Sequence, residues 1–393
     1  MRFPEFEDQW QVRKLGEICK IYDGTHQTPN YVQSGISFYS VENITSDNFK
    51  NTKYVSEAVY EKENKRVKIE KGDILMTRIG DIGTSKYVDW DVKASFYVSV
   101  ALIKQSLGVD MRYLNQFIST NFFQRELWNR TIHVAFPKKI NLGEISECVV
   151  FVPCIREQNK IASLLTLIDT RIHTQSKIIK DLKFFKSKLN KKIFNQQLRF
   201  ADNIIQQHDW QIKKLGEVCK IIGGGTPETN KSEYWNGDIQ WFTPTEIKTN
   251  YVRKSQRTIT SLGLNNSSAK LLPKGAILLT TRATIGEVAI ALEECSTNQG
   301  FQSLIPNEGI NGVFIFNWLK ENKYELVKRA NGSTFSEISK SELEGINIAI
   351  PSLSEQTKIS SCFSLIDTKI ENEERLLRLL EYQKQSLLRE LFV

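Results

Sequence analysis

The sequence predicts an α+β protein in which two homologous globular domains are separated by two long helices that form an antiparallel coiled coil, giving a pseudo-two-fold molecule. Three observations support this fold class. Segments of the first half of the chain recur in the second half, heptad-spaced apolar residues follow each copy, and each copy mixes short apolar strands with turns.

The repeat begins with WQVRKLGEICKI at Trp10 and WQIKKLGEVCKI at Trp210, which are identical at nine of twelve positions. KGDILMT from Lys71 matches KGAILLT from Lys274. PCIREQNKIASLLTLIDTRI from Pro153 matches PSLSEQTKISSCFSLIDTKI from Pro351. A period of about 200 residues is too long for a solenoid or a propeller blade. The order of the chain is therefore domain, helix, domain, helix.

Each globular half is expected to be α+β because its strands and helices do not alternate regularly. Strands are predicted at 36–41, 73–77, 97–103 and 148–152, with counterparts at 239–242, 276–280, 301–305 and 346–350. One helix is predicted in each half, at 111–121 and 313–322.

After each half, apolar residues recur at alternating steps of four and three, the spacing of a coiled-coil seam. The predicted seam consists of Ile161, Leu165, Ile168, Ile172, Ile179, Leu182, Leu189, Ile193, Ile359, Phe363, Ile366, Ile370, Leu377, Leu380, Leu387 and Leu391. Helices of about 43 residues span roughly 65 Å. Two apolar stripes of equal length are expected to pair antiparallel, and the alternative is that each helix packs only on its own domain.

The first of these helices is strongly basic, with eleven Lys or Arg and three acidic residues between 155 and 200. Such a face suits DNA phosphates or an acidic partner, and a solvated surface is the alternative.

Composition narrows the classes of protein. Of the 393 residues 40% are hydrophobic and 25% charged, which excludes a disordered or fibrous chain. No run of about 18 apolar residues predicts a membrane span, and the first residues lack the apolar core of a signal peptide. The six cysteines form no Cys-x-x-Cys pair, which favours a cytoplasmic protein without disulfides or structural zinc. The net charge of +8 permits a nucleic-acid partner.

Signatures of catalysis are missing from the sequence. It contains no GxxxxGK[ST] phosphate loop, no HExxH and no Asn-Pro-Pro-aromatic tetrad, and its four histidines are far apart. The segment GGGTP at 223–227 lacks the GxGxxG spacing of a dinucleotide site and suits a turn. We therefore expect no catalytic residue and no metal site.

Two homologous domains, each followed by a long helix, resemble the specificity (S) subunit of type I restriction–modification enzymes. The resemblance covers essentially the whole chain. The motifs that carry it are the repeated WQ-x-x-KLGE-x-CKI segment, GGGTP, KGAILLTTRATIGEVAI at 274–290, and Pro-x-x-x-Glu-Gln-x-Lys-Ile at 153–161 and 351–359, each followed by Leu-Ile-Asp-Thr. By this resemblance, 1–152 is target-recognition domain 1, 153–200 the first conserved spacer helix, 201–350 target-recognition domain 2 and 351–393 the second conserved spacer helix.

The resemblance implies a non-catalytic subunit that recognises a bipartite sequence in double-stranded DNA. Each recognition domain would read one half-site, and the coiled coil would set the spacer between them. Two methyltransferase (M) subunits would dock on the chain, and restriction (R) subunits would join them. S-adenosylmethionine, ATP and Mg²⁺ are implied only for these partners, and no cofactor is implied for this chain.

Side chains in polar turns and basic clusters are the candidates for DNA contacts, because polar and cationic groups read base edges and phosphates. The candidates are Thr25, His26, Gln27, Arg78, Lys138, Lys139, Thr226, Thr243, Thr245, Arg253, Lys254, Arg257, Arg282, Asn298, Gln299, Ser333 and Thr334. For the basic clusters a solvated face is the alternative. Arg78 and Arg282 are expected in equivalent turns, where arginine suits bidentate contact with guanine, and a structural ion pair is the alternative.

Two other functions stay open on the sequence alone. A self-sufficient DNA nuclease or methyltransferase would turn over without a partner. A coiled-coil protein scaffold would bind its partner but show no salt-dependent affinity for DNA.

Overall fold

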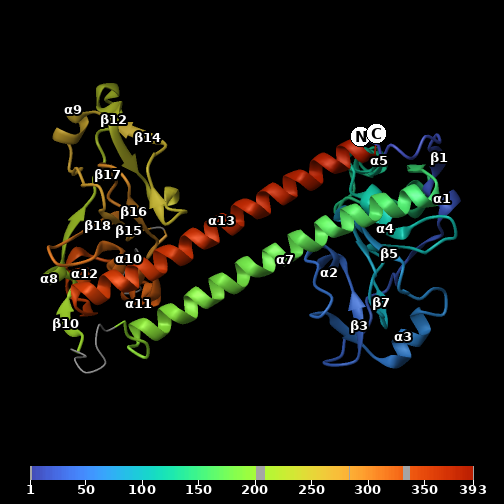
Figure 1. The fold of residues 1–393 in the computed structure, drawn as a ribbon, viewed down its shortest axis with the longest axis horizontal. Helices are drawn as coiled ribbons and strands as arrows, with labels where there is room; N and C mark the ends of the chain where they lie inside the picture. Colours follow the sequence, from blue (N-terminus) through green and yellow to red (C-terminus); the bar gives the residue numbers. More distant parts are fainter. Residues whose placement is uncertain (1, 201–208, 283, 331–336, 393) are drawn as a thin grey trace. The chain divides into compact units, whose positions relative to one another are not determined.

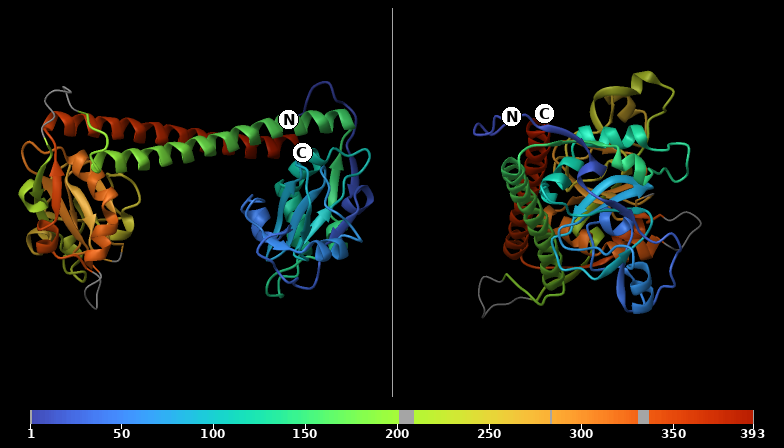
Figure 2. Two further views of the ribbon diagram at one scale, coloured as in Figure 1. Left: turned by 90° about the horizontal axis from the view of Figure 1, so that it is seen from below. Right: turned by 90° about the vertical axis from the view of Figure 1, so that its right-hand side faces the viewer.

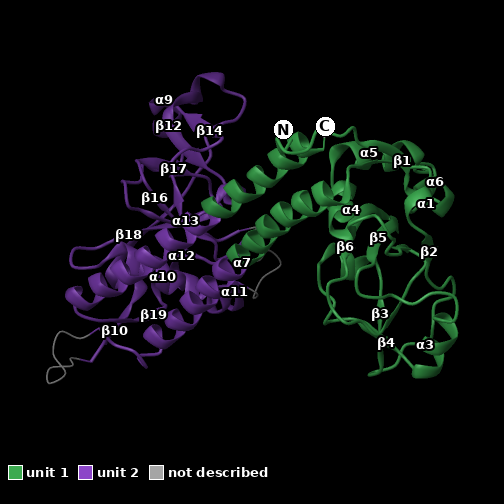
Figure 3. Ribbon diagram, turned by 45° about the vertical axis from the view of Figure 1, so that its right-hand side comes forward, with its two compact units in different colours: residues 1–176, 375–393 green, residues 177–374 purple. Residues whose placement is uncertain are grey.

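The chain divides into two compact units (Figure 3). The structure is a computed structural model that describes residues 2–200, 209–282, 284–330 and 337–392. Unit 1 comprises Met1–Ser176 and Arg375–Val393, and unit 2 comprises Lys177–Glu374. Two long helices, α7 (Ile155–Phe194) and α13 (Leu353–Leu391), each contribute one part to unit 1 and the other part to unit 2.

Unit 1 contains a four-stranded sheet in the order β2-β8-β5-β6, a three-stranded sheet β4-β3-β7 and the antiparallel pair β1-β9 (Figure 1). Its strands are β1 (Gln11–Lys14), β2 (Ile21–Asp23), β3 (Ile36–Tyr39), β4 (Lys53–Val55), β5 (Ile74–Ile79), β6 (Asp81–Tyr87), β7 (Ala94–Phe96), β8 (Val100–Ile103) and β9 (Val149–Val152). Its shorter helices are α1 (Leu15–Ile18), α2 (Val41–Thr45), α3 (Glu57–Glu63), α4 (Met111–Ile118), α5 (Asn121–Arg130) and α6 (Leu142–Ser146).

Unit 2 repeats this plan, with a sheet β11-β18-β15-β16-β13, a sheet β14-β12-β17 and the pair β10-β19. Its strands are β10 (Gln211–Lys214), β11 (Cys219–Gly223), β12 (Trp235–Phe242), β13 (Tyr251–Val252), β14 (Arg257–Ile259), β15 (Ile277–Thr280), β16 (Val288–Ala291), β17 (Cys295–Thr297), β18 (Phe301–Pro306) and β19 (Asn347–Ile350). Its shorter helices are α8 (Leu215–Val218), η1 (Ser232–Tyr234), η2 (Pro244–Glu246), α9 (Ser261–Asn265), α10 (Gly312–Glu321), α11 (Lys323–Ala330) and α12 (Lys340–Glu344).

The α+β class and the duplication predicted from the sequence are confirmed. Each of the eight predicted strands overlaps an observed one, and the largest difference is β12, which begins at Trp235 and not at 239. The two predicted helices correspond to α4 and α10. The order β2-β8-β5-β6 in unit 1 matches β11-β18-β15-β16 in unit 2, where β13 is added at the edge, so the repeated segments adopt the same topology.

Each unit has its own apolar core under the sheet. In unit 1 the buried face of α4, with Leu114 and Phe117, packs against Ile74 of β5 and Ile103 of β8. In unit 2 Phe314 and Ile315 of α10 belong to the equivalent cluster. Burial of one such side chain contributes about 1.5–3 kcal/mol, so these clusters hold the strands, and the turns at their ends, in place.

Within each unit a segment of α7 packs against a segment of α13 with opposite direction, and both lie along one side of the strands (Figure 2). In unit 1, Ile161 and Leu165 share a core with Leu388 and Leu391. All sixteen predicted seam residues are buried or half-buried. The helix segments also contact the globular part of their unit. The apolar stripes therefore serve both predicted purposes, pairing of the two helices and packing on a globular domain.

Two lysines interrupt the apolar seam, and each pairs with an aspartate of the repeated Leu-Ile-Asp-Thr motif. In unit 2, Lys186 Nζ donates to Asp367 Oδ1 at 2.6 Å and Oδ2 at 2.7 Å. In unit 1, Lys384 Nζ lies 2.6 Å from Asp169 Oδ1. A slip of one helix past the other would leave these charges unpaired, so the pairs fix the register within each unit. Part of the positive charge of the first helix is thereby matched by acidic residues of the second.

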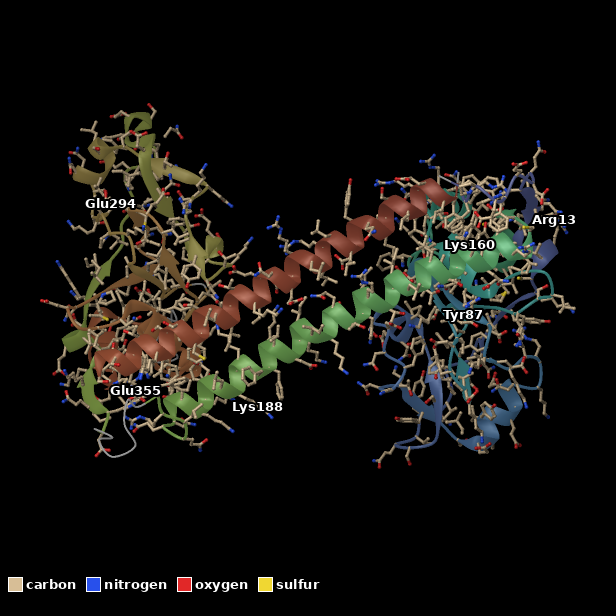
Figure 4. The ribbon with its side chains drawn as sticks, in the orientation of Figure 1. Arg13, Tyr87, Lys160, Lys188, Glu294 and Glu355 are labelled. Carbon is tan, nitrogen blue, oxygen red and sulfur yellow. The ribbon has the colours of Figure 1, made fainter. Side chains whose placement is uncertain are left out.

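A buried glutamate ties the start of each repeat to the first turn of the following long helix. Glu355, in the first turn of α13 (Figure 4), is 3% exposed and accepts from Arg199 Nε at 2.8 Å and from Trp210 Nε1 at 3.3 Å. In unit 1, Glu157 accepts in the same way from Arg2 and Trp10. The Glu of the Pro-x-x-x-Glu-Gln motif therefore has a structural role. Sequence comparison missed the Arg-Phe dipeptide that precedes each tryptophan at 2–3 and 199–200.

The boundaries between the two compact units fall inside the long helices. They do not test the predicted bounds of the recognition domains at 152, 200 and 350, which stay predictions. Helices α7 and α13 begin two residues after Pro153 and Pro351. Among the described residues, no helix combines the length and apolar character needed to cross a membrane.

Candidate nucleic-acid interface

In unit 1 the turn after β2 is fixed against the β7–β8 connection and presents polar side chains. Thr25 N donates to Phe96 O at 3.0 Å, and Val98 N donates to Thr25 O at 3.0 Å. A side chain at Gly24 would collide with the Phe96 carbonyl, so this close approach requires glycine. The turn exposes His26 and Gln27, two of the predicted candidates, beside a rigid sheet edge.

The carboxylate of Asp23 binds two side chains, His26 and Arg66, at the base of this turn. His26 Nε2 lies 2.8 Å from Asp23 Oδ2, and Arg66 donates to both the carboxylate and the main-chain oxygen of Asp23. Burial raises the pKa of Asp23, but the hydrogen bonds from Arg66 and His26 outweigh burial and lower it. A cavity of about 300 Å³ opens here, with Lys62 and Lys65 in its lining. The lining also holds Arg66 and two acidic residues, Asp23 and Glu63, so basic residues outnumber acidic ones, a balance that suits a phosphate of the DNA backbone.

Arg78 does not lie in a turn, as the sequence suggested, but inside β5, where it is 6% exposed. Its Nε donates to Val98 O and its Nη1 to Ile140 O, each at 2.9 Å, and its Nη2 lies 3.6 Å from Asp23 Oδ2. Burial lowers the pKa of Arg78, and the charge of Asp23 opposes this shift. The guanidinium presents no free edge to a base, so the ion-pair alternative holds for Arg78. Through these contacts Arg78 links the His26 turn and the segment that ends at Ile140 to strand β5.

Replacing Arg78 by Met is expected to destabilise unit 1 by about 2–4 kcal/mol, because the carbonyls of Val98 and Ile140 lose their donor and Asp23 loses one of its three cationic neighbours. Thermal unfolding measures this effect. Arg282→Met is the matched control and should change stability by less than about 0.5 kcal/mol, since Arg282 is exposed. Equal effects of the two substitutions would contradict the structural role of Arg78.

Lys138 and Lys139 lie in the connection between α5 and α6, which docks on the end of β5. Gly80 N donates to Lys138 O, and Ile132 N donates to Lys139 O, each at 2.8 Å. The Lys138 ammonium lies 4.8 Å from the centre of the Trp128 ring. A second cleft of about 260 Å³ is lined by Gly80, Trp128 and Lys138, among others. Through Arg78, these lysines belong to the same region of unit 1 as Thr25, His26 and Gln27.

In unit 2 the GGGTP turn occupies the equivalent place. Gly225 N donates to Thr297 O at 2.8 Å, as Thr25 N does to Phe96 O, and a side chain at Gly224 would collide with Asn298 O. Thr226 Oγ1 donates to Gln299 Oε1 at 2.5 Å. The main chain of Asn298 donates to Phe242 O at 3.0 Å, which places it beside the next residue, Thr243. The Thr243 and Thr245 hydroxyls are 3.3 Å apart. The structure thus brings together the predicted candidates Thr226, Thr243, Thr245, Asn298 and Gln299.

The expected equivalence of Arg78 and Arg282 is wrong. Arg78 N donates to Ser99 O, and the matching bond in unit 2 is Thr281 N to Gly300 O, so Thr281 is the counterpart of Arg78. Thr281 is fully buried. Arg282 is the next residue, with an exposed side chain whose Nη2 lies 2.8 Å from Glu337 Oε2. The segments from Thr77 to Gly83 and from Thr280 to Gly286 are equally long, but β15 ends at Thr280, so Arg282 lies beyond the strand.

Three further basic candidates are exposed: Arg253 and Lys254 lie between β13 and β14, and Arg257 is the first residue of β14. Arg253 Nη1 lies 2.7 Å from Glu293 Oε1. The Arg257 guanidinium stacks 3.6 Å from the centre of the Trp235 ring, which holds its plane in a fixed orientation. Ser333 and Thr334 lie outside the described residues.

The described residues contain no group of three or more His, Cys, Asp and Glu side chains placed to hold a metal ion. Burial raises the pKa of the repeat-equivalent thiols of Cys19 and Cys219 to about 12, so neither is a nucleophile at neutral pH. The chemistry that these surfaces offer is hydrogen bonding and charge.

A family model described as the type I restriction modification DNA specificity domain matches residues 7–183 and again residues 207–382. The chain belongs to this family. Each matched segment ends inside a long helix, so each copy of the specificity domain includes one globular half and most of the helix that follows it.

Relatives of this chain are named as specificity subunits. The MjaIX specificity subunit of Methanocaldococcus jannaschii is 38% identical over 190 residues, which cover 47% of this chain and 44% of that relative. The putative MjaX specificity subunit of the same organism is 24% identical over 401 residues, covering 98% of this chain and 93% of that one. The solved S subunit from M. genitalium has a TM-score of 0.64 at 15% identity and covers 100% of this chain and 97% of its own, which supports the fold.

Proposed function

We propose that this chain is the DNA-recognition subunit of a type I restriction–modification complex and that it reads a bipartite target, one half-site per specificity domain. One observation carries the proposal. The same turn at the same sheet edge carries Thr25, His26 and Gln27 in unit 1, but Thr226 and the neighbouring Asn298 and Gln299 in unit 2. A shared scaffold with different polar side chains suits the reading of two different sequences.

Basic side chains beside these turns would position the DNA without reading it. Lys138 and Lys139 in unit 1, and Lys254 and Arg257 in unit 2, are exposed and suit phosphate contacts. Binding through such contacts weakens steeply with salt. This salt dependence separates the proposal from the scaffold alternative, which predicts partner binding without affinity for DNA.

Exposed apolar residues on the long helices support docking of methyltransferase (M) subunits. They occur at equivalent positions of the repeat: Leu167 and Leu365 are 65% and 72% exposed, and Phe184 and Tyr382 are 60% and 68% exposed. Exposed apolar residues do not stabilise a helix in water, but they stabilise its contact with a protein partner. Because the set occurs twice, it suits two copies of one partner. We propose that these are two M subunits and that restriction (R) subunits join the assembly through them.

The double substitution Phe184→Glu and Tyr382→Glu is expected to weaken binding of the M subunit at least ten-fold, because both would place a charge in an apolar contact. Co-purification and calorimetry with the cognate M subunit measure the effect. Glu294→Lys, a charge change on an exposed residue of unit 2 that is not on a long helix (Figure 4), is the control and should bind as the unaltered chain does. Full M binding by the double variant would refute this docking surface.

We assign the chemistry of the complex to its partners: S-adenosylmethionine to the M subunits, ATP and Mg²⁺ to the R subunits, and no cofactor to this chain. A location in the cytoplasm follows from this assignment. The purified chain alone should neither transfer methyl groups from S-adenosylmethionine nor cleave DNA with Mg²⁺ and ATP, whereas the chain with its M subunit should methylate DNA. Turnover by the chain alone would favour the self-sufficient enzyme.

A further inference from the structure

The connection between α5 and α6 in unit 1 carries two large apolar side chains without cover. Val134 is 97% exposed and Phe136 is 103% exposed. An exposed phenylalanine forgoes the roughly 1.5–3 kcal/mol that burial would contribute, so the folding of unit 1 does not explain this arrangement. The side chain is available to a binding partner.

Both ends of this connection are anchored to the sheet. Ile132 N donates to Lys139 O at 2.8 Å, and Ile140 N donates to Arg78 O at 3.0 Å. Between them, His133 Nε2 lies 2.9 Å from Trp128 O, and the two rings are 4.3 Å apart. The apolar tip therefore projects from a fixed base that Arg78 also joins to the turn of His26 and Gln27.

The surroundings of the tip are basic. Residues 127–143 include Arg130, His133, Lys138 and Lys139 and no acidic residue. Arg130 pairs with Glu126, but Lys138 and Lys139, two and three residues from Phe136, are exposed. The apolar tip would be enough for a contact with another protein, and the flanking lysines would not be needed. An apolar side chain flanked by exposed lysines is complementary to DNA, in which stacked bases lie between two rows of phosphates.

We propose that Phe136 is a wedge that inserts between two base pairs of the half-site read by unit 1, with Lys138 and Lys139 on the flanking phosphates. This inference rests on the proposed function and deepens it. Apolar side chains inserted in this way partly unstack a base step and kink the duplex. Pyrimidine–purine steps open most easily, so the wedge would add a preference for such a step at a fixed distance from the bases met by His26 and Gln27.

The test uses the complex of this chain with its M subunits and a duplex that carries the recognised motif. The fluorescent base 2-aminopurine, which is quenched by stacking, is placed at successive positions of each half-site. Apart from any position where the M subunit flips out an adenine, the unaltered complex should give a several-fold rise in fluorescence at one step of one half-site. Phe136→Ala should abolish that rise and weaken binding about ten-fold, as expected for loss of an aromatic contact with bases. The signal at the adenine that the M subunit flips out for methylation should persist.

The control is Leu107→Ala, since Leu107 is 102% exposed in the same unit and lies away from this loop in the sequence. If Phe136→Ala and Leu107→Ala both bind and unstack the motif as the unaltered complex does, the wedge is wrong and the proposed function stands. If Phe136→Ala loses the M subunit while the fluorescence rise persists, the tip contacts protein and the wedge is wrong. If the unaltered complex does not prefer its motif to a scrambled duplex, the proposed function fails, and the wedge fails with it.

Discussion

Insertion of seven residues into each long helix is expected to lengthen the spacer of the recognised DNA motif by about three base pairs. Seven helical residues lengthen a helix by roughly 10 Å. Each base pair lengthens B-DNA by about 3.4 Å, so this length corresponds to about three base pairs. The structure suggests where to insert the residues. Sites after Ser176 and after Glu374 lie between the Asp169–Lys384 and Lys186–Asp367 pairs, so each ion pair keeps its partner within its own unit.

The inserted segment should follow the heptad pattern, because the seam then continues without a change of face. Three base pairs also turn the second half-site by about a third of a helical turn, so we expect less methylation of the new motif than of the original one. An insertion in α7 alone is the control. It displaces the pairing of the helices and should abolish recognition. Maps of methyladenine read out the motif, and an unchanged spacer in the double insertion would refute the role of the helices as a ruler.

Glu355→Gln is expected to destabilise unit 2 by about 3 kcal/mol, because it removes the charge that Arg199 requires in a buried site. The carboxylate accepts from Arg199 Nε and Nη2 and from the main-chain N–H of Phe200 at 3.0 Å. Burial raises the pKa of Glu355, but these hydrogen bonds outweigh burial and hold it below its ordinary value of 4.5. Thermal unfolding of the full chain measures the loss in the transition of unit 2.

The same carboxylate predicts a dependence on pH. Since the pKa of Glu355 is lowered in the folded state, its contribution to stability is fully present above the ordinary value of 4.5 and is lost as the pH falls through the lower folded value. Below pH 4.5 the unaltered chain should therefore lose stability more steeply than Glu355→Gln. Parallel pH profiles of the two proteins would contradict this assignment.

Glu157→Gln is the matched substitution in unit 1 and should cost less. The side chain of Arg2 is 33% exposed, whereas that of Arg199 is 13% exposed, so Arg2 can turn to water when its partner is lost. An equal loss of stability in both units would show that the exposure of the arginine does not decide the cost.

Periodic features were predictable from the sequence. The heptad spacing located both long helices because an apolar stripe needs a partner, and Lys186 and Lys384 stand at seam positions in that spacing. Their partners, Asp367 and Asp169, could not be assigned, because pairing across two helices depends on direction and register that one stripe does not contain. The repeated Leu-Ile-Asp-Thr motif carried the signal, since each copy supplies one of these aspartates.

The candidate interface was predictable only in part. Polar turns after strands drew attention to Thr25, His26, Thr226 and Gln299, and the sheet order brings the members of each set together. Arg78 was misplaced because an arginine follows both matched segments, KGDILMT and KGAILLT. Their alignment pairs Arg78 with Thr281, as the main-chain hydrogen bonds do, so the sequence contained this signal. Phe136 was missed because the sequence does not distinguish an exposed phenylalanine from a buried one. The run of basic residues without acids around it was the signal available.

The most direct test is a genome-wide map of methyladenine in the source cells, with the gene intact, deleted and restored. A split motif with two specified halves and a fixed spacer should be methylated in the intact strain, lost on deletion and recovered on restoration. To exclude a system without expressed partners, the chain and its cognate M subunit are also produced together in a host without adenine methylation, where the same motif should become methylated. An unchanged map on deletion, together with no motif in that host, would contradict recognition of DNA by this chain.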